Sequence, residues 1–344
     1  MKTRLRAWVL TACALHAVGC GGPGTGADCQ SCDLDRAKIA ELRAPIEAEP
    51  TLSSVVRQDG RGRFYVAPLV DPYKIAIFDS AGSYLGSFGQ RGEGPGEFSE
   101  IRGLELGPGD TLYVLHADRI SIFSPEHTFV RSTSSSAARR SDHIVLDSRG
   151  TIATGRTSTT YRGPPEALVW THNGETVPRG LVEAERTASG LVMFRDTAWV
   201  LRSDYSVYRS ADLVRWDSII GPPVWYLDKT EAAEEGSSRS PSLAGFIVDE
   251  EHAWALIYEY KPLPPRPPSS GGEEPLRPLS SSELMEVATP RFDVWDRRGK
   301  LVASIKGSTP VRFVRPHLLH EVVEDSAGSQ WINVYRFHLR QTPH

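Results

Sequence analysis

Short apolar runs alternate with turn residues along most of this chain. A typical run, residues 63–67, contains Phe64, Tyr65 and Val66, and it follows the turn pair Asp59-Gly60. Short runs of β-branched and aromatic residues bounded by Gly, Pro, Asp and Ser predict β-strands. No long segment shows the periodicity of an amphipathic helix. We therefore expect an all-β protein.

The apolar runs recur as a repeated unit. In the first unit the turn is followed by runs at residues 63–67, 75–79 and 82–89, and the matching first runs of five later units begin at residues 111, 151, 198, 253 and 329. A preceding apolar segment supplies a further strand in each unit: residues 54–56, 103–106, 144–146, 190–194, 245–248 and 321–323. Tyr65 and Tyr113 are 48 residues apart, and propeller blades repeat every 40–50 residues or so, that is, at about this spacing. The pattern predicts a six-bladed β-propeller of four-stranded antiparallel blades over residues 35–344, with both faces of each blade buried against its neighbours.

The last unit is one strand short. We expect its strands at residues 321–323, 329–332 and 334–337, which leaves no outer strand before the chain ends. Residues 38–43, on the N-terminal side of the first unit, have the composition of a strand. We expect them to complete the sixth blade and close the ring. In the fourth unit the outer strand is expected at residues 213–214.

A glycine-rich connector follows the first unit. Residues 88–98 read Phe-Gly-Gln-Arg-Gly-Glu-Gly-Pro-Gly-Glu-Phe, which is similar to the inter-blade connector of NHL-type propellers, where Pro-Gly-Glu-Phe leads one blade into the next. The chain resembles the family of six-bladed propeller lipoproteins of bacteria. The resemblance covers about residues 35–340 and is strongest in the first two units, because the later units lack the connector.

A proline-rich insertion interrupts the fifth unit at residues 261–282. Its Pro, Ser and Gly content is typical of extended chain that does not pack into a core. We expect a surface loop between the second and third strands of this blade. It is either a tolerated loop or an arm that binds a partner in the polyproline conformation.

The N-terminus has the organisation of an export signal. Lys2, Arg4 and Arg6 precede an apolar run at residues 7–19 that is too short to span a membrane. The run ends at Cys20 after small residues, and this resembles the bacterial lipobox. We expect residues 1–19 to be a lipoprotein signal peptide and Cys20 to carry the lipid, so that the protein is membrane-anchored; the alternative is an ordinary secretory signal with a chance cysteine. Gly21, by resemblance to the sorting rule of Gram-negative lipoproteins, implies the outer membrane.

The remaining cysteines lie in a short tether, residues 20–34. Cys29 and Cys32 are the two thiols that cleavage and lipidation would leave. In an oxidising compartment a local disulfide between them is the simplest interpretation. A redox role would require a βαβ context around the pair, and none is visible. A zinc site would need two more ligands.

Charge narrows the choice of partners. The formal net charge is −4, and loss of Lys2, Arg4 and Arg6 with the signal peptide makes the mature chain more negative. Nucleic-acid binding requires a basic footprint, so we expect no nucleic-acid partner. No nucleophile elbow, phosphate loop or zinc-protease motif occurs.

In propellers, catalytic and binding residues lie at the mouth of the central channel, in the loops that lead into the innermost strands. Those positions are residues 52–53, 101–102, 142–143, 188–189, 243–244 and 317–320, with Arg57 deeper on the first innermost strand. Asp142 is the one acid in this set, so a calcium site of the gluconolactonase kind or a quinone-dependent sugar dehydrogenase is disfavoured. His143, His317 and His320 are the possible convergent histidines of a site that resembles streptogramin lyase, or they are unrelated channel and surface residues.

Together these observations favour a lipid-anchored envelope propeller that acts as a non-enzymatic binding module for a protein, peptide or glycan, with no cofactor and no metal. The alternative is a propeller hydrolase or lyase that uses Arg102, Asp142, His143 and His320. A third possibility is a structural envelope protein that assembles through the proline-rich loop. Fold alone does not decide among them.

Overall fold

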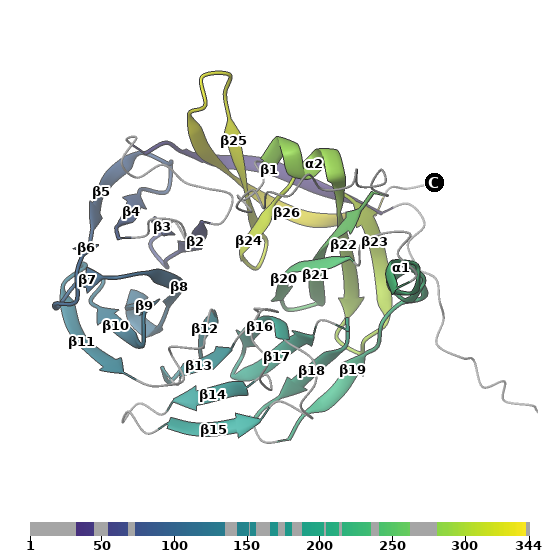
Figure 1. Cartoon of the computed structure of the whole chain (residues 1–344), viewed down its shortest axis with the longest axis horizontal. Coiled ribbons are helices and arrows are strands. Elements are labelled where there is room, and N and C mark those ends of the chain that lie inside the picture. Colours follow the sequence, from purple (N-terminus) through teal and green to yellow (C-terminus); the bar gives the residue numbers. More distant parts are fainter. Residues whose placement is uncertain are drawn as a thin grey trace, which may run out of the picture.

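The computed structural model describes residues 32–44, 54–67, 73–134, 143–150, 152–155, 166–170, 176–180, 188–202, 204–212, 215–234, 241–261 and 281–341. These residues form a β-propeller of four-stranded antiparallel blades arranged in a ring (Figure 1). Six four-stranded sheets occur in this part of the chain. The predicted signal peptide, Cys20, Cys29 and Asp142 lie outside it.

The first three sheets follow the chain from the innermost strand outward. The first consists of β2 (Val55–Gln58), β3 (Phe64–Ala67), β4 (Ile75–Phe78) and β5 (Tyr84–Phe88). The second consists of β8 (Ile101–Leu106), β9 (Leu112–His116), β10 (Arg119–Phe123) and β11 (Phe129–Ser134). The third consists of β12 (His143–Leu146), β13 (Ile152–Gly155), β14 (Glu166–Trp170) and β15 (Thr176–Gly180).

The other three sheets follow the same scheme until the chain ends. The fourth consists of β16 (Ala188–Phe194), β17 (Thr197–Arg202), β18 (Val207–Ser210) and β19 (Asp217–Ile220). The fifth consists of β20 (Ser242–Val248), β21 (His252–Tyr260), β22 (Ala288–Asp296) and β23 (Leu301–Lys306). The sixth consists of β24 (Arg312–Arg315), β25 (Leu318–Glu324), β26 (Gln330–Gln341) and, outermost, β1 (Cys32–Leu42).

Ring closure joins the two ends of the domain. β1 pairs antiparallel with β26, from Cys32 opposite Gln341 to Leu42 opposite Ile332, and in Figure 1 the purple N-terminal strand lies along the yellow C-terminal one. The predicted closing strand at residues 38–43 is therefore confirmed. It is longer than expected, and its first residues belong to the segment assigned to the tether. Cys32 is disulfide-bonded, whereas its pairing with Cys29 stays a prediction.

The innermost strands contact one another in the order β2, β8, β12, β16, β20, β24 and back to β2. Between adjacent sheets lie the apolar clusters that hold the ring together. One cluster joins Tyr65 of the first sheet to Leu104 and Phe123 of the second, and another joins Leu42 and Val334 of the sixth sheet to the first. Each fully buried large side chain contributes about 1.5–3 kcal/mol relative to its exposed state. Burial on both faces of each sheet is thus the main stabilising term.

The sixth sheet corrects the sequence-based phasing. Residues 329–332 and 334–337 belong to one strand, β26, and the innermost strand is β24 rather than residues 321–323, which lie in β25. Asn333 interrupts the apolar pattern of β26 without ending it, because its neighbours continue the pairing with β1 and β25. β24 reads Arg-Phe-Val-Arg, so its apolar run is too short to stand out.

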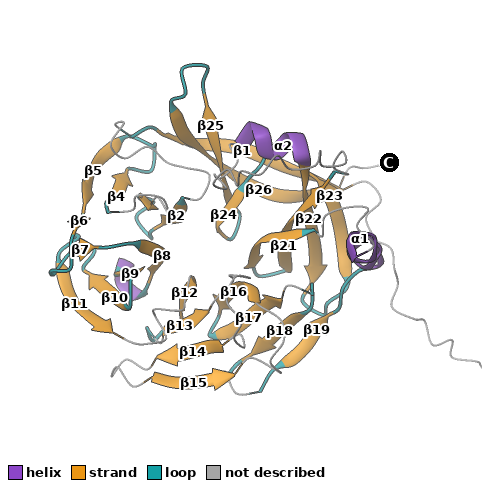
Figure 2. Cartoon of the chain, in the orientation of Figure 1, coloured by secondary structure: helices purple, strands orange, loops and turns teal. Residues whose placement is uncertain are grey.

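Smaller corrections concern the fourth sheet and the helices. The outer strand of the fourth sheet is β19, not residues 213–214, which lie outside the described residues. The α-helices α1 (Val224–Glu234) and α2 (Ser281–Val287) and a short 3-10 helix (Pro108–Asp110) were not expected. Figure 2 shows α1 at the outer edge of the ring. None of the described helices is long and apolar enough to cross a membrane.

The connector lies where it was expected, between β5 and β8. It contains the two short parallel strands β6 (Gln90–Arg91) and β7 (Glu97–Phe98). Glu97 organises the turn, because its carboxylate accepts hydrogen bonds from the Gly94 N–H at 2.8 Å and the Gln90 side chain at 2.7 Å. Phe98 is fully buried between the first two sheets. The connector therefore anchors one sheet to the next through an aromatic side chain.

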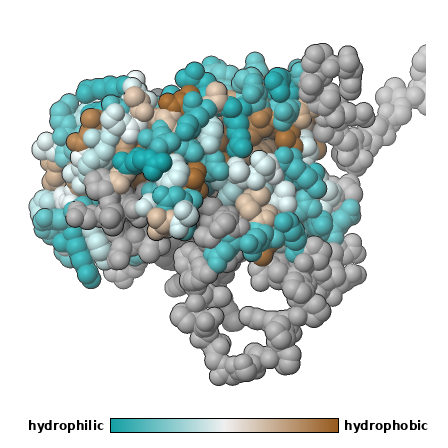
Figure 3. Space-filling view, turned by 90° about the horizontal axis from the view of Figure 1, so that it is seen from above, coloured by the Kyte–Doolittle hydropathy of each residue, from teal (hydrophilic) through white to brown (hydrophobic). Residues whose placement is uncertain are grey.

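The proline-rich insertion connects β21 to β22, the second and third strands of the fifth sheet, as predicted. Residues 262–280 are outside the described part of the chain. Where the connection returns, the Lys261 N–H donates to the Val287 carbonyl at 2.8 Å. In the space-filling view the described surface is mostly hydrophilic, with small scattered apolar groups (Figure 3).

Candidate functional site

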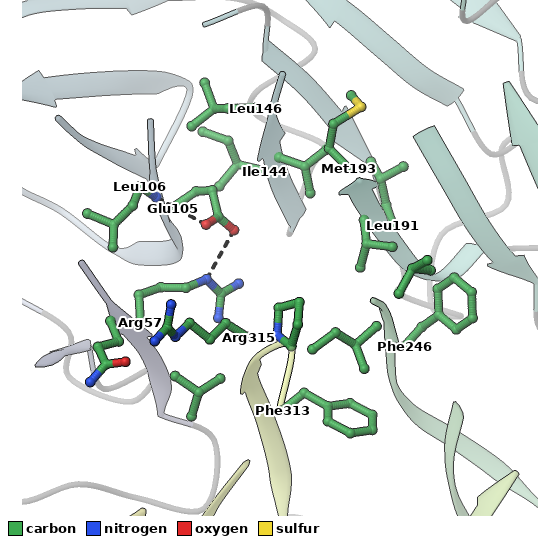
Figure 4. A pocket seen from close by; sticks show the side chains of 17 residues that line it. Arg57, Glu105, Leu106, Ile144, Leu146, Leu191, Met193, Phe246, Phe313 and Arg315 are labelled. Atoms are coloured by element: carbon green, nitrogen blue, oxygen red, sulfur yellow. Dashed lines mark hydrogen bonds and ion pairs between the residues drawn. The ribbon is translucent and has the colours of Figure 1, made fainter. Parts of the chain in front are cut away.

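The innermost strands surround two cavities in the central channel. The mouth cavity, of about 330 Å³, includes Ser54, Arg102, Ala244, Arg312 and His320, near the starts of these strands. The far cavity, of about 340 Å³, includes residues from the strand ends, and Figure 4 shows it. Six residues line both cavities: Arg57, Ile144, Leu191, Val192, Phe246 and Phe313. The two cavities therefore form one channel with a shared middle.

A repeated local motif shapes the mouth. A register shift follows Ile101 in β8, Ala188 in β16 and Leu243 in β20, and pairing resumes at a glycine in each case. A bulge re-aims the side chain at the extra position. A Cβ on Gly190 would lie 2.7 Å from the Phe246 Cβ, and one on Gly245 would lie 3.0 Å from the Phe313 ring. Glycine at these sites thus lets the next sheet bring an aromatic residue close to the channel.

The channel wall has two unlike halves. Arg57, Arg102 and Arg312 come from β2, β8 and β24, which are consecutive around the ring, and His320 lies beside Arg312 on β25. The opposite half, on β12, β16 and β20, is apolar (Ile144, Gly190, Leu191, Val192, Ala244, Gly245 and Phe246). No Asp or Glu occurs among the described residues of the mouth cavity. The mouth is therefore cationic on one side and apolar on the other.

Arg57 is held in the middle of the channel. Its Nε lies 3.0 Å from a Glu105 carboxylate oxygen, and its NH1 donates to the Val56 carbonyl at 3.0 Å. Figure 4 shows this pair beside Arg315, with Leu146, Leu191 and Met193 across the cavity. Both members of the pair are half-buried. Arg57 was expected on the first innermost strand, and its position there is confirmed.

Arg312 and His320 face each other across the β24–β25 pair. Arg312 is half-buried, and desolvation lowers the pKa of its guanidinium. His320 is only 2% exposed. Burial, and then the charges of Arg312 and Arg57, lower the pKa of His320 to about 3. Neither ring nitrogen of His320 has a hydrogen-bond partner among the described residues, so a neutral imidazole faces the mouth cavity.

The predicted mouth residues separate into two groups. Arg102 and His320 line the mouth cavity, but His320 lies in the second strand of its sheet rather than in a mouth loop. His317 lies in the β24–β25 turn, at the far end of the channel, with its Nε2 4.0 Å from Asp249. His317 and His320 therefore do not converge. His143 begins β12, and its side chain, like Asp142, lies outside what the structure describes.

Two arginines of the channel were not predicted from the sequence. Arg312 and Arg315 belong to β24, which was not predicted as a strand, so neither was placed at the channel. The adjacent apolar residues Phe313 and Val314, with an arginine on each side, were the available signal. Within the described residues, no group of three or more His, Cys, Asp or Glu side chains is placed to hold a metal ion.

A second buried polar cluster lies between α1 and the fifth sheet and does not line either cavity. Asp293 is fully buried and accepts hydrogen bonds from the Trp225 indole at 3.0 Å, from Arg291 Nε at 3.2 Å, and from the hydroxyls of Tyr205 and Ser304. The Arg291 guanidinium stacks 4.0 Å from the centroid of the Trp225 ring. These contacts fasten α1 to the fifth sheet, and we call the five residues the anchor cluster.

Comparison with known proteins supports the fold alone. No family model and no curated protein matches this chain. Among solved structures, a Bacteroides fragilis protein named as a candidate exported protein superposes with a TM-score of 0.58 at 8% identity, covering 92% of this chain and 97% of that one. Regucalcin from Agrobacterium tumefaciens, a calcium-binding protein, gives 0.52 at 10% identity, covering 86% and 94%. The WD40 domain of Neurospora crassa Pan2 gives 0.51 at 10%, covering 88% and 95%.

Proposed function

We propose that this chain is a lipid-anchored envelope protein whose six-bladed propeller binds a ligand in its central channel without transforming it. The ligand is a small molecule or a group presented by a peptide, protein or glycan. The observation that carries this proposal is the channel itself. Its two cavities, of about 340 and 330 Å³, share their middle residues and fall in the size range of ligand pockets, roughly 300–1,000 Å³.

The six-blade count is supported by the six four-stranded sheets and by the cyclic contacts of their innermost strands. The lipid anchor rests on the sequence around Cys20. If Cys20 is acylated, Cys20→Ala abolishes labelling by a clickable palmitate analogue and moves the protein from the membrane fraction to the soluble fraction. Retention of both label and membrane association would contradict the anchor.

The enzymatic alternative loses one of its four residues. A general base works best when its pKa lies near the working pH, and the pKa of His320 is lowered to about 3 by burial and by neighbouring arginines. His320 is therefore a poor acid–base catalyst near neutral pH. Arg102, Asp142 and His143 remain as candidates for a hydrolase or lyase, and loss of turnover in His143→Ala would favour that alternative.

The test of the binding proposal is a thermal-shift screen of the purified protein with small-molecule, peptide and glycan panels. Ala244→Trp places a bulky ring at the channel mouth, whereas Ala81→Trp places the same ring in an exposed turn between β4 and β5. We expect a ligand class that raises Tm in the wild type and in Ala81→Trp but not in Ala244→Trp, and that is recovered chemically unchanged. No shift with any class, or an altered ligand, would overturn the proposal.

A further inference from the structure

Arg312 is a half-buried cation that lacks an acceptor among the described residues. It lies at the start of β24, lines the mouth cavity, and has no hydrogen-bond or ion-pair partner among the residues that the structure describes. Burial of a guanidinium without an opposite charge is unfavourable. A protein tolerates such a group where a bound anion completes the site. Arg312 therefore marks where a negative charge would be stabilised.

The other cations of the mouth are already engaged. Arg57 pairs with Glu105 at 3.0 Å, and Arg102 has an interaction partner of its own. Among the arginines of the described mouth lining, Arg312 is the one without a hydrogen-bond or ion-pair partner. One negative charge balances it, and two would exceed it. The charge balance thus favours a monoanion such as a carboxylate over a phosphate dianion.

His320 adds a second polar contact. Its ring is 2% exposed, lies opposite Arg312 across the strand pair, and has no partner at either nitrogen within the described structure. A neutral imidazole offers one N–H donor and one acceptor. With the guanidinium fork on one side, an imidazole N–H can serve the same carboxylate, because that group accepts several hydrogen bonds.

The apolar half of the wall indicates what is attached to the anionic group. Leu191, Val192 and Phe246 face the cationic half across the cavity. Glycine at 190 and 245 allows the aromatic residues of the next sheets to approach. An inorganic anion would leave this apolar surface uncovered, whereas an aliphatic or aromatic body would bury it.

From these contacts we infer that the channel mouth binds a small organic monocarboxylate, with its carboxylate on Arg312 and His320 and its apolar body against Leu191, Val192 and Phe246. This inference rests on the proposed function, namely that the channel is a ligand site, and it specifies the chemical class of that ligand.

The experiment is isothermal titration of the intact purified protein with four probes: 3-phenylpropionate, its neutral amide, acetate and inorganic phosphate. We expect 3-phenylpropionate to bind at least about tenfold more tightly than each of the other three. The amide shows how much of the affinity depends on the negative charge, and acetate shows how much depends on the apolar body. Tighter binding of phosphate, or equal binding of acid and amide, would overturn the inference.

Variants assign the binding to the mouth. Arg312→Met keeps the side-chain volume and removes the charge. We therefore expect it to weaken binding of 3-phenylpropionate at least about tenfold and to leave the affinity for the amide unchanged. Arg131→Met removes the same charge from an exposed position on the outermost strand β11, and we expect full binding. His320→Gln keeps a hydrogen-bonding side chain and provides a second test if Arg312→Met fails to fold; we expect weaker acid binding with circular dichroism like that of the wild type. Unchanged acid binding in both folded variants would overturn the assignment.

Failure of this inference is distinguishable from failure of the proposed function. No heat from 3-phenylpropionate up to about 10 mM overturns the monocarboxylate class. If the peptide, glycan or neutral panels still raise Tm in a manner blocked by Ala244→Trp, the channel remains a binding site for a different class. If they do not, the proposed function itself is wrong.

Discussion

The anchor cluster and the channel mouth both bury charged groups, but they treat them differently. In the anchor cluster, both oxygens of Asp293 accept hydrogen bonds, two each, from Tyr205, Trp225, Arg291 and Ser304. In the mouth, His320 is buried with no hydrogen-bond partner at either ring nitrogen among the described residues, and Arg312 beside it is half-buried. A buried charge with a full set of partners holds elements together, whereas one without them leaves interaction capacity for a ligand. The contrast separates a structural cluster from a functional one.

The largest expected effect is on the anchor cluster. Asp293→Ala removes the acceptor of the hydrogen bonds from Trp225, Tyr205 and Ser304 and the carboxylate that Arg291 faces, so we expect the free energy of unfolding to fall by about 3–5 kcal/mol. Urea denaturation measures it. Asp217→Ala, at an exposed position on the outermost strand β19, is the control, and we expect a change within about 0.5 kcal/mol. Equal effects of the two variants would erase the contrast.

The second prediction concerns pH and the mouth. His320 is buried neutral, and burial lowers its pKa from 6.5 to about 3. Between these two pH values, His320 is protonated in the unfolded chain and neutral in the folded protein. The stability contributed by His320 is complete above pH 6.5 and falls by up to about 1.4 kcal/mol per pH unit as the pH drops toward 3.

His116 produces a parallel loss, because burial and then the charges of Arg119 and Arg102 lower its pKa to about 4. His320→Gln should remove its own share of the slope and leave that of His116. Unfolding free energies measured at pH 7, 6, 5 and 4.5 test this, and an unchanged slope in His320→Gln would show that the folded protein accepts the proton.

The smallest expected effect is the one with opposite sign. Arg312→Met replaces a half-buried cation that has no acceptor among the described residues with an apolar side chain of similar volume, so we expect the free energy of unfolding to stay unchanged or rise by about 1 kcal/mol. Arg291→Met in the anchor cluster is the matched change and should be destabilising by about 3 kcal/mol, because it leaves Asp293 without its cation. If the two variants destabilise alike, Arg312 is a structural residue and the comparison fails.

The elements that a local pattern marks were predicted correctly. The strands of the first sheet, the connector at residues 88–98 and the place of the proline-rich insertion were predicted from apolar runs and turn residues, and the structure has them there. The prediction was poorest at β24, where only two apolar residues stand between arginines. There the burial of Phe313 and Val314 depends on neighbouring sheets, and local sequence carries little of that information.

The candidate site was predicted in part for the same reason. Arg57 and Arg102 lie on innermost strands that the apolar pattern marked, so their places at the channel could be foreseen. Arg312 could not be, because no strand was predicted at residues 312–315, and His320 was assigned to a mouth loop when it lies in a second strand. The anchor cluster has no local signal, because Trp225 donates to Asp293, which lies 68 residues later in the sequence.

By itself the sequence determined the all-β class, the repeated four-stranded unit and the strand that closes the ring, because period, turn chemistry and strand length are properties of neighbouring residues. Only the tertiary structure decided which side chains share the channel. Arg57, Arg102 and Arg312 come together because ring closure places the sixth sheet beside the first. The electrostatic potential at these arginines depends on charged residues from opposite ends of the chain, so a local sequence pattern cannot predict it.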